Sequence, residues 1–431
     1  MRYLRQRRKD LDGFVPLRST HHPKMDIPGL EDYNEFLVGS KGKKMSTTMG
    51  LVRLLSKLSR DQRIGKHVVP IVPDESRTFG MEGMFRQVGI YAHAGQLYDP
   101  VDSDLLLYYK EAQDGQILEE GITEAGSMSS FVAAGTAYCQ HGINMIPFFI
   151  YYSMFGFQRI GDLIWAAADM RAKGFMIGGT AGRTTLNGEG LQHQDGHSLL
   201  NAIAFPTVRA YDPAFAYETA VIVMDGLKKM YQQGETAIYY LAVENETYAM
   251  PEMPPGVEEG IIKGIYKLSS KEADTKANRK ASRKAGEGPD RVQLLGSGPI
   301  LRETLRAQEI LAERFDVSSD VWSVTSYSQL RHEAQAADRW NMLPPAETPR
   351  RSYLEEVIGG CEGPFVAASD YVRSVAQQLT PWIPGDYYVL GTDGMGRSET
   401  RETLRRHFEV DAECITAAAL YRLCELDKLQ A

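Results

Sequence analysis

The feature that most constrains the fold is a regular alternation of short apolar segments with longer amphipathic ones. Between residues 67 and 243, the segments that read as β-strands are HVVPIVPD, NMIPFFIYY, GFMIGGTA, PTVRAYDP and TAIYYLAV. Helical patterns such as ITEAGSMSSFVAAGTAYCQ and RIGDLIWAAADMRAK separate most of them. Short apolar strands that alternate with helices form a parallel sheet covered on both faces. The sequence therefore predicts a doubly wound α/β fold.

A charged segment separates this unit from a second one with the same pattern. Residues 268–290 contain almost no large apolar side chains and predict a solvated linker or loop. The strand patterns RVQLLGSG, SDVWSVTS, PFVAASD and DYYVLGTDG then follow. We expect an extended N-terminal arm at 1–45, a first domain at 46–255, a linker with a charged loop at 256–290, and a second, mostly parallel α/β domain at 291–431.

Composition argues against several functional classes. The formal charge of -8 over 431 residues gives no electrostatic basis for binding nucleic acid or an anionic membrane. No run of about 18 apolar residues is present, so no transmembrane helix is expected. The N-terminal MRYLRQRRKDLDG lacks the apolar core of a signal peptide. The four cysteines have no paired spacing, which fits a reducing cytoplasm rather than a disulfide or zinc framework.

Polar residues gather where the predicted strands of the first domain end, and open parallel sheets bind ligands at that edge. Strand 68–73 leads into Asp74 and Glu75, which could also form a solvated turn with Arg77. Glu124 begins a helix, where the helix dipole favours a carboxylate that could be an ordinary cap. The glycine-rich loop 180–198 carries Arg183, Glu189, His193, Asp195 and His197.

The loop and the carboxylates predict acid–base chemistry rather than metal chemistry. A long polar loop inside an α/β domain is usually functional. His193 and His197 have the spacing of a helical metal pair, but Gly190 and Gly196 argue against a helix there. We therefore expect no metal site, and we expect carboxylate and histidine groups to act on a bound ligand.

The segment FFIYYSMFGFQRIGDLIW, residues 148–165, is unusually rich in aromatic side chains at a strand end. Such rings either fill a core or grip a flat ligand, and the segment alone favours the core. Its position beside Glu124 and the 180–198 loop favours a division of roles. In that interpretation the aromatic turn contacts a ligand, while apolar side chains on either side of it pack in the core, namely Phe148, Phe149, Ile150, Ile160, Leu163 and Trp165.

With these segments in view, the chain resembles the thiamine-diphosphate-dependent pyruvate dehydrogenase component of the bacterial homodimeric type. The matching motifs are PIVPDESRTFGMEGMFRQVGIY, ILEEGITEAG, IPFFIYYSMFGFQRIGDLIWAA, IGGTAGRTTLNGEGLQHQDGHS, LLGSG, DRWNMLPP and LGTDGMGRS, and they span essentially the whole chain. The resemblance implies a pyrimidine-binding domain followed by a transketolase C-terminal-like domain. The family's first domain, which binds the cofactor's diphosphate through Mg²⁺, has no counterpart, so no Mg²⁺ ligands are expected in this chain.

The resemblance also implies roles for individual residues. Glu124 matches the glutamate that donates a hydrogen bond to the pyrimidine ring nitrogen of thiamine diphosphate. Phe155 matches the aromatic side chain that stacks on that ring, and Tyr152 lies beside it. His193 matches a histidine at the substrate end of the site. Three further residues match positions near the cofactor, namely Glu75, Arg159 and Glu189.

The function implied is part of a pyruvate dehydrogenase that decarboxylates pyruvate and reductively acetylates lipoyl groups of an acyltransferase. The expected assembly is a homodimer that also needs a chain or domain carrying the diphosphate-binding half. Met1 would then begin a split-gene subunit, a fragment or an internal start. Two alternatives stay open: a half of a transketolase or another 2-oxoacid dehydrogenase, and a non-catalytic dimerisation or docking module.

Overall fold

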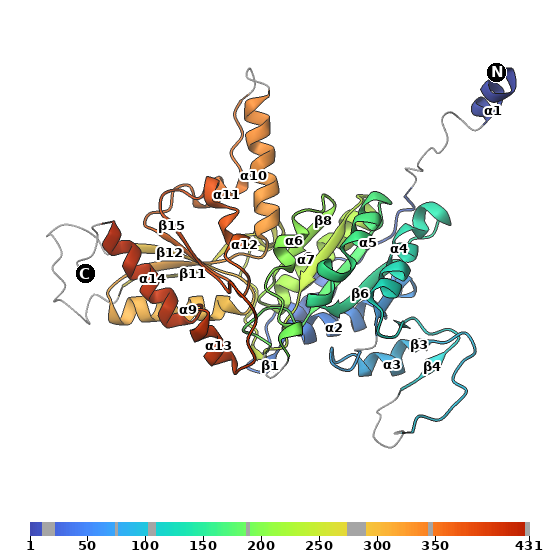
Figure 1. Ribbon diagram of the computed structural model, residues 1–431, viewed down its shortest axis with the longest axis horizontal. Coiled ribbons are helices and arrows are strands. Elements are labelled where there is room, and N and C mark those ends of the chain that lie inside the picture. The colour runs from blue at the N-terminus through green and yellow to red at the C-terminus, as the bar shows by residue number, and fades with distance from the viewer. Residues whose placement is uncertain are drawn as a thin grey trace.

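The computed structural model describes residues 1–10, 22–73, 76–101, 109–186, 190–273, 290–343 and 348–426. It contains two large sheets, each covered by helices, that lie side by side in the molecule (Figure 1). The first sheet has the strand order β5-β2-β6-β7-β9-β8, and all its neighbouring strands are parallel. The second has the order β11-β13-β12-β14-β15, in which only β11 pairs antiparallel. The predicted class, two mostly parallel α/β units, is confirmed.

The first unit is built on the β5-β2-β6-β7-β9-β8 sheet. Its strands are β2 (Val68–Val72), β5 (Leu118–Glu119), β6 (Ile146–Tyr152), β7 (Gly174–Gly179), β8 (Val208–Tyr211) and β9 (Ile238–Ala242). Its helices are α2 (Thr47–Leu58), α3 (Glu82–Val88), α4 (Glu124–Gln140), α5 (Phe157–Asp169), α6 (Ser198–Ala202) and α7 (Ala216–Leu227). Short ribbons pair β1 (Lys44–Met45) with β10 (Tyr248–Ala249) and β3 (Ile90–Tyr91) with β4 (Glu111–Ala112).

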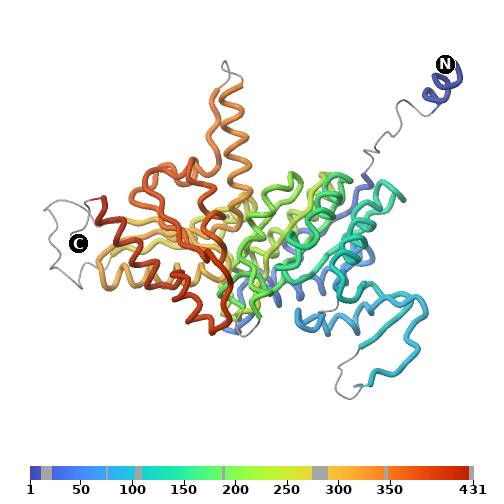
Figure 2. Tube along the Cα trace, viewed as in Figure 1, coloured from blue at the N-terminus to red at the C-terminus, as the bar shows by residue number. Residues whose placement is uncertain are grey.

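The second unit is built on the sheet that ends in β15. Its strands are β11 (Tyr266–Lys271), β12 (Arg291–Gly296), β13 (Ser318–Ser323), β14 (Phe365–Ala368) and β15 (Tyr387–Leu390). Its helices are α9 (Ile300–Arg314), α10 (Tyr327–Met342), α11 (Tyr353–Ile358), α12 (Ser374–Gln377), α13 (Arg401–His407) and α14 (Ala412–Glu425). Helix α10 projects away from the rest of the molecule, as the tube in Figure 2 shows.

Side-chain alternation along the central strands explains the layers of the first unit. In β6, Phe148 and Ile150 pack on one face of the sheet with α2 and α7. Phe149 and Tyr151 point to the opposite face and pack with α4 and α5. Both faces are therefore buried, as a parallel sheet requires, and the strand reads as a continuous apolar run.

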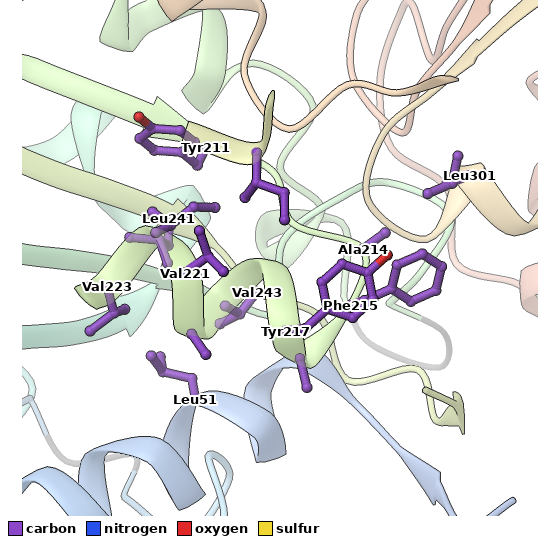
Figure 3. Packing of buried hydrophobic residues seen from close by; sticks show 14 of the residues in the cluster. Leu51, Tyr211, Ala214, Phe215, Tyr217, Val221, Val223, Leu241, Val243 and Leu301 are labelled. Carbon is purple, nitrogen blue, oxygen red and sulfur yellow. The ribbon is translucent and has the colours of Figure 1, made fainter. Parts of the chain in front are cut away.

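The packing of α7 joins the two units. Figure 3 shows Leu51 of α2, Val221 of α7 and Leu241 of β9 on the first-unit side of this cluster. The same cluster includes Leu301 of α9, which belongs to the second unit, and Phe215 at the start of α7. Since one apolar cluster crosses from the first sheet to the second, the two units are packed against each other.

Two segments differ from the expected extended arm and linker. Residues 1–45 include the exposed helix α1 (Arg2–Asp10) and the 3₁₀ segment η1 (Leu30–Phe36), and the latter buries Tyr33 and Phe36. In the expected linker, α8 (Glu258–Lys263) is followed by β11, which pairs with β13. β11 is an edge strand with many polar side chains, so its sequence does not show the apolar pattern of a buried strand. Ser270, for example, donates a hydrogen bond to Asp320. Most of the charged loop, residues 274–289, lies outside the described residues.

Candidate functional site

The first component of the site is a buried carboxylate at the start of α4. Thr123 caps this helix and accepts a hydrogen bond from the Gly126 amide at 3.1 Å. Glu124 is the first residue of the helix and is only 7% exposed. Its Oε2 accepts from Nη1 of Arg159 at 3.0 Å. The amino-terminal end of α4 and the guanidinium of Arg159 therefore hold this carboxyl group in place.

The second component is a group of rings where β6 ends. Tyr152 is the last residue of β6, and Phe155 closes the 3₁₀ turn η3 (Ser153–Phe155). Their ring centroids lie 6.1 Å apart with an edge-to-face angle of 87°. The guanidinium of Arg159 lies 4.1 Å from the Phe155 ring centroid. Arg159 therefore connects the aromatic group to Glu124.

The third component is His193 in the short 3₁₀ segment η4 (Leu191–His193). Its ring stacks on Tyr152 with a centroid distance of 4.6 Å and an angle of 13°. It also meets the edge of Phe155 at 5.5 Å and 75°. The structure thus brings together five of the residues predicted from the sequence: Glu124, Tyr152, Phe155, Arg159 and His193. The other two, Glu75 and Glu189, lie outside the described residues.

A further aromatic residue, Phe79, supports these rings in space left by a glycine, and it was not predicted from the sequence. Phe79 is buried and packs against Tyr152 with a centroid distance of 5.6 Å. A Cβ atom on Gly179, at the end of β7, would lie only 2.3 Å from the Phe79 ring. Gly179 therefore lets Phe79 occupy the space under Tyr152. The GG pair that ends β7 is the sequence feature that could have indicated this close contact.

The loop that carries His193 is held by the second unit. Asp370, which follows β14, accepts hydrogen bonds from the Thr184 amide at 2.9 Å and the Thr185 hydroxyl at 2.7 Å. Arg397 donates its amide to Gln194 at 2.6 Å. These contacts flank η4 on both sides in the sequence, so the second unit fixes the path of the loop. The loop lies at the edge of the first sheet, as predicted from its sequence, whereas no sequence pattern indicated Asp370.

Further carboxyl groups are buried at the seam between the units, behind the loop. Asp212 follows β8, and burial raises its pKa to about 8. The nearby Ser297 hydroxyl opposes that rise, but neither carboxyl oxygen of Asp212 has a hydrogen bond of normal geometry within the described chain. Glu244 follows β9, and burial raises its pKa well above the usual range, with Asp370 and Asp212 acting in the same direction. Burial therefore favours the neutral form of both carboxyl groups.

Two family models match the chain, one over each unit. Residues 25–251 match the family model described as the pyruvate dehydrogenase E1 component middle domain. This chain belongs to the pyruvate dehydrogenase E1 family. Residues 280–411 match a second family model, the transketolase-like C-terminal domain.

Curated relatives support the same family. The chain is 53% identical over 425 residues to the pyruvate dehydrogenase E1 component of Pseudomonas aeruginosa, a match that covers 98% of this chain and 47% of the relative. The identity to the pyruvate dehydrogenase E1 component of Escherichia coli K12 is 50% over 433 residues, with 99% and 47% covered. The chain therefore spans about half the length of the curated relatives it matches.

Solved structures share the fold at low sequence identity. The transketolase of Leishmania mexicana matches with a TM-score of 0.64 and 14% identity, over 100% of this chain and 52% of that one. Campylobacter jejuni transketolase matches with a TM-score of 0.63 and 16% identity, over 90% and 49%. A split-gene transketolase, described as an inactive β4 tetramer, matches with a TM-score of 0.52 and 16% identity, over 88% and 98%. This chain and these transketolase structures thus share a fold of two α/β units.

One predicted packing residue is placed differently in this E1 chain. Trp165 was expected in the core, but it is 53% exposed, whereas Ile160 and Ile164 are buried. The buried stripe of α5 continues through Ala167 and Ala168, and Trp165 lies one position away from it on the helix surface.

Among the described residues, no group of three or more histidine, cysteine, aspartate or glutamate side chains could hold a metal ion. Among the helices in the same residues, none is both long and apolar enough to cross a membrane.

Proposed function

We propose that this chain supplies the pyrimidine-binding half of a thiamine diphosphate site in a pyruvate dehydrogenase, together with the transketolase C-terminal-like unit. The observation that carries the proposal is the contact group Glu124, Arg159, Phe155, Tyr152 and His193 at one edge of the first sheet. Family membership supports the same assignment.

The donor set of this group fits an aminopyrimidine. Such a ring needs an apolar face on which to stack and a carboxyl group that can exchange a hydrogen bond with a ring nitrogen. Phe155 and Tyr152 offer aromatic faces, and Glu124 offers a largely buried carboxyl group. Glu75 and Glu189 are proposed to lie near the cofactor as well. When bound, the cofactor supplies the electron sink for the decarboxylation of pyruvate.

The residues of this chain would then bind, orient and exchange protons. Glu124 holds or donates a proton at the pyrimidine edge, and Arg159 sets the position of its carboxyl group. His193, held against Tyr152, faces the substrate end and binds the pyruvate carboxylate or moves a proton there. The charged diphosphate group and its Mg²⁺ would be held by a chain or domain that carries the diphosphate-binding half.

The proposed assembly follows from this division of the site. We propose a homodimer in the cytoplasm, in complex with the diphosphate-binding half and with a lipoyl acyltransferase that accepts the acetyl group. The description of the split-gene transketolase neighbour as inactive supports the idea that such a two-unit chain needs a partner. The alternatives, a half of another 2-oxoacid dehydrogenase or transketolase and a non-catalytic docking module, make different predictions in the same assay.

The test is reconstitution. The chain is mixed with a separately produced diphosphate-binding chain, thiamine diphosphate and Mg²⁺, and the decarboxylation of pyruvate is measured beside that of branched-chain oxoacids and transfer from ketose phosphates. We expect activity with pyruvate, and a loss of about 10²- to 10⁴-fold in Glu124→Gln, which cannot carry the proton. Asp162→Asn, an exposed carboxylate on α5, is the matched control and should retain activity.

The outcomes separate the alternatives. A demonstrably assembled mixture without any turnover would contradict the enzymatic role and support the docking module. Preference for a different substrate would place the chain in another thiamine-dependent enzyme.

A further inference from the structure

A cavity whose lining includes none of the residues of the aromatic group lies at the seam between the two units and is rich in arginines. It has a volume of about 570 Å³, in the range of small-molecule sites. Its walls come from α9, α13 and the start of α14 in the second unit, and from the segment after β9 in the first. The arginines that line it are Arg302, Arg306, Arg401, Arg405 and Arg406.

The floor of this cavity is a network of ion pairs. Glu246 accepts from Arg302 at 2.8 Å and also pairs with Arg405. Glu303 pairs with Arg405 at 3.2 Å and with Arg306 at 2.9 Å. Three arginines therefore share two glutamates. Because Arg405 lies between both glutamates and is buried, Arg302 and Arg306 stand at the open side of this network.

Arg401 adds a fourth cation to the floor. Its Nε donates to the Thr185 carbonyl at 2.5 Å, and no carboxylate of the described residues lies within ion-pair distance of it. Partial burial and the neighbouring Arg405 lower its pKa, although the group stays charged at neutral pH. Arg401 is thus the lining arginine with no carboxylate partner among the described residues, although the complete lining balances five arginines with five carboxyl groups.

Acidic side chains predominate at the rim of the cavity. Arg406 pairs with Asp411 at 2.7 Å and with Glu413 at 3.4 Å. Glu402, in the first turn of α13, is exposed at the entrance. Negative rim charges oppose the approach of an anion, so a ligand must be small enough to reach the floor and to pair with it closely.

We propose that this cavity binds a small anion that carries a phosphate group. A phosphate group can pair with the Arg401 guanidinium, which no carboxylate of the described residues occupies, and guanidinium groups offer paired N–H donors that match phosphate oxygens. Arg302, Arg306 and Arg401 each keep N–H groups that their ion pairs and hydrogen bonds do not use. The site is separate from the proposed thiamine site and does not depend on it.

Binding at Arg401 would also reach the loop that carries His193. Arg401 holds the Thr185 carbonyl, and the Thr185 amide and hydroxyl are bonded to Asp370 at 3.1 and 2.7 Å. An anion on Arg401 therefore clamps α13 and the 181–186 segment together. Occupancy should stabilise the seam between the units as well as the cavity itself.

The experiment measures binding of inorganic phosphate and pyrophosphate to the full chain by calorimetry and thermal unfolding, with chloride at matched ionic strength as the blank. We expect both anions to bind and to raise the melting temperature. Arg401→Gln should weaken pyrophosphate binding by about tenfold or more, because a charged hydrogen-bond partner is lost. Arg401→Lys keeps the positive charge but lacks the paired N–H donors of a guanidinium. Its affinity for pyrophosphate should lie between those of the wild type and Arg401→Gln.

Two further variants guard against a purely structural effect. Glu402→Gln removes a rim charge and should tighten pyrophosphate binding by up to about fivefold. Arg314→Gln, an exposed arginine at the far end of α9, should bind like the wild type. Absence of binding by the wild type, or equal affinities of Arg401→Gln and Arg314→Gln, would overturn the proposal.

Discussion

Arg159 donates a hydrogen bond to Glu124 at 3.0 Å, and this ion pair joins helix α5 to the first turn of α4. The Arg159 side chain is half-exposed, so the pair contributes under about 1 kcal/mol to folding. Its value to the protein lies in placing the Glu124 carboxyl group. Arg159→Met should therefore leave the free energy of unfolding nearly unchanged while it lowers kcat/KM of the reconstituted enzyme about tenfold.

Arg159→Lys provides the matched comparison for that prediction. Lysine restores a positive charge but not the planar group that covers the Phe155 ring, so an intermediate activity is expected. Wild-type activity in Arg159→Met would show that the ion pair has no positioning role.

The stack of Tyr152 on His193 predicts a difference between removing the ring and removing only its hydroxyl. Aromatic pairs contribute about 0.5–1.5 kcal/mol beyond the area they bury. Tyr152→Ala removes the stack at 4.6 Å and should weaken the apparent affinity for thiamine diphosphate by roughly threefold to tenfold. Tyr152→Phe keeps the ring and should bind as the wild type does. The measurement is the cofactor dependence of the reconstituted activity, and equal losses in both variants would contradict a stacking role.

Gly179 and Phe79 predict a compensating pair of substitutions. A methyl group in Gly179→Ala would lie 2.3 Å from the Phe79 ring, so the ring must move against Tyr152. Such overpacking costs about 1–3 kcal/mol, measurable by urea unfolding. Phe79→Leu shortens the opposing side chain, and adding it to Gly179→Ala should recover part of that loss. Strict additivity of the two losses would argue against the contact.

The buried Asp212 predicts a pH-dependent stability. Burial raises its pKa from 3.8 to about 8, so the folded protein binds a proton that the unfolded chain releases over this range. The contribution of this group is therefore fully present below about pH 4 and is lost as the pH rises through about 8. Asp212→Asn cannot ionise, so its stability relative to the wild type should increase with pH, by up to about 1.4 kcal/mol per pH unit. Urea unfolding between pH 6 and 8 tests this, and parallel curves for the two proteins would contradict it.

The architecture could be predicted from the sequence because the periodicities of strands and helices indicate which of their faces are buried. The apolar run of β6 and the amphipathic stripe of α5 specify a covered parallel sheet and one of its helices. Strand ends also follow from the pattern, and in parallel strands these ends meet at one edge. For that reason Glu124, Tyr152, Phe155 and His193 could be proposed together from the sequence, and the structure brings them into one contact group.

Periodicity was less informative where a segment is short or partly polar. The edge strand β11 reads as a linker because four of its six side chains are polar, and some of them bond to neighbours such as Asp320. Trp165 reads as core because apolarity alone does not say on which side of a helix a residue falls.

The amino-acid sequence by itself determined the α/β class and the edge at which the strand ends meet, since both depend on local pattern, and the family resemblance indicated which residues at that edge form the group. Only the tertiary structure decided how the two units meet. Asp370 bonds Thr185 across 185 positions of the chain, and Arg401 reaches the same residue from 216 positions away. Such contacts arise from the packing of one finished sheet against another, which no local period encodes, and they hold the His193 loop, bury Asp212 and form the arginine-lined cavity.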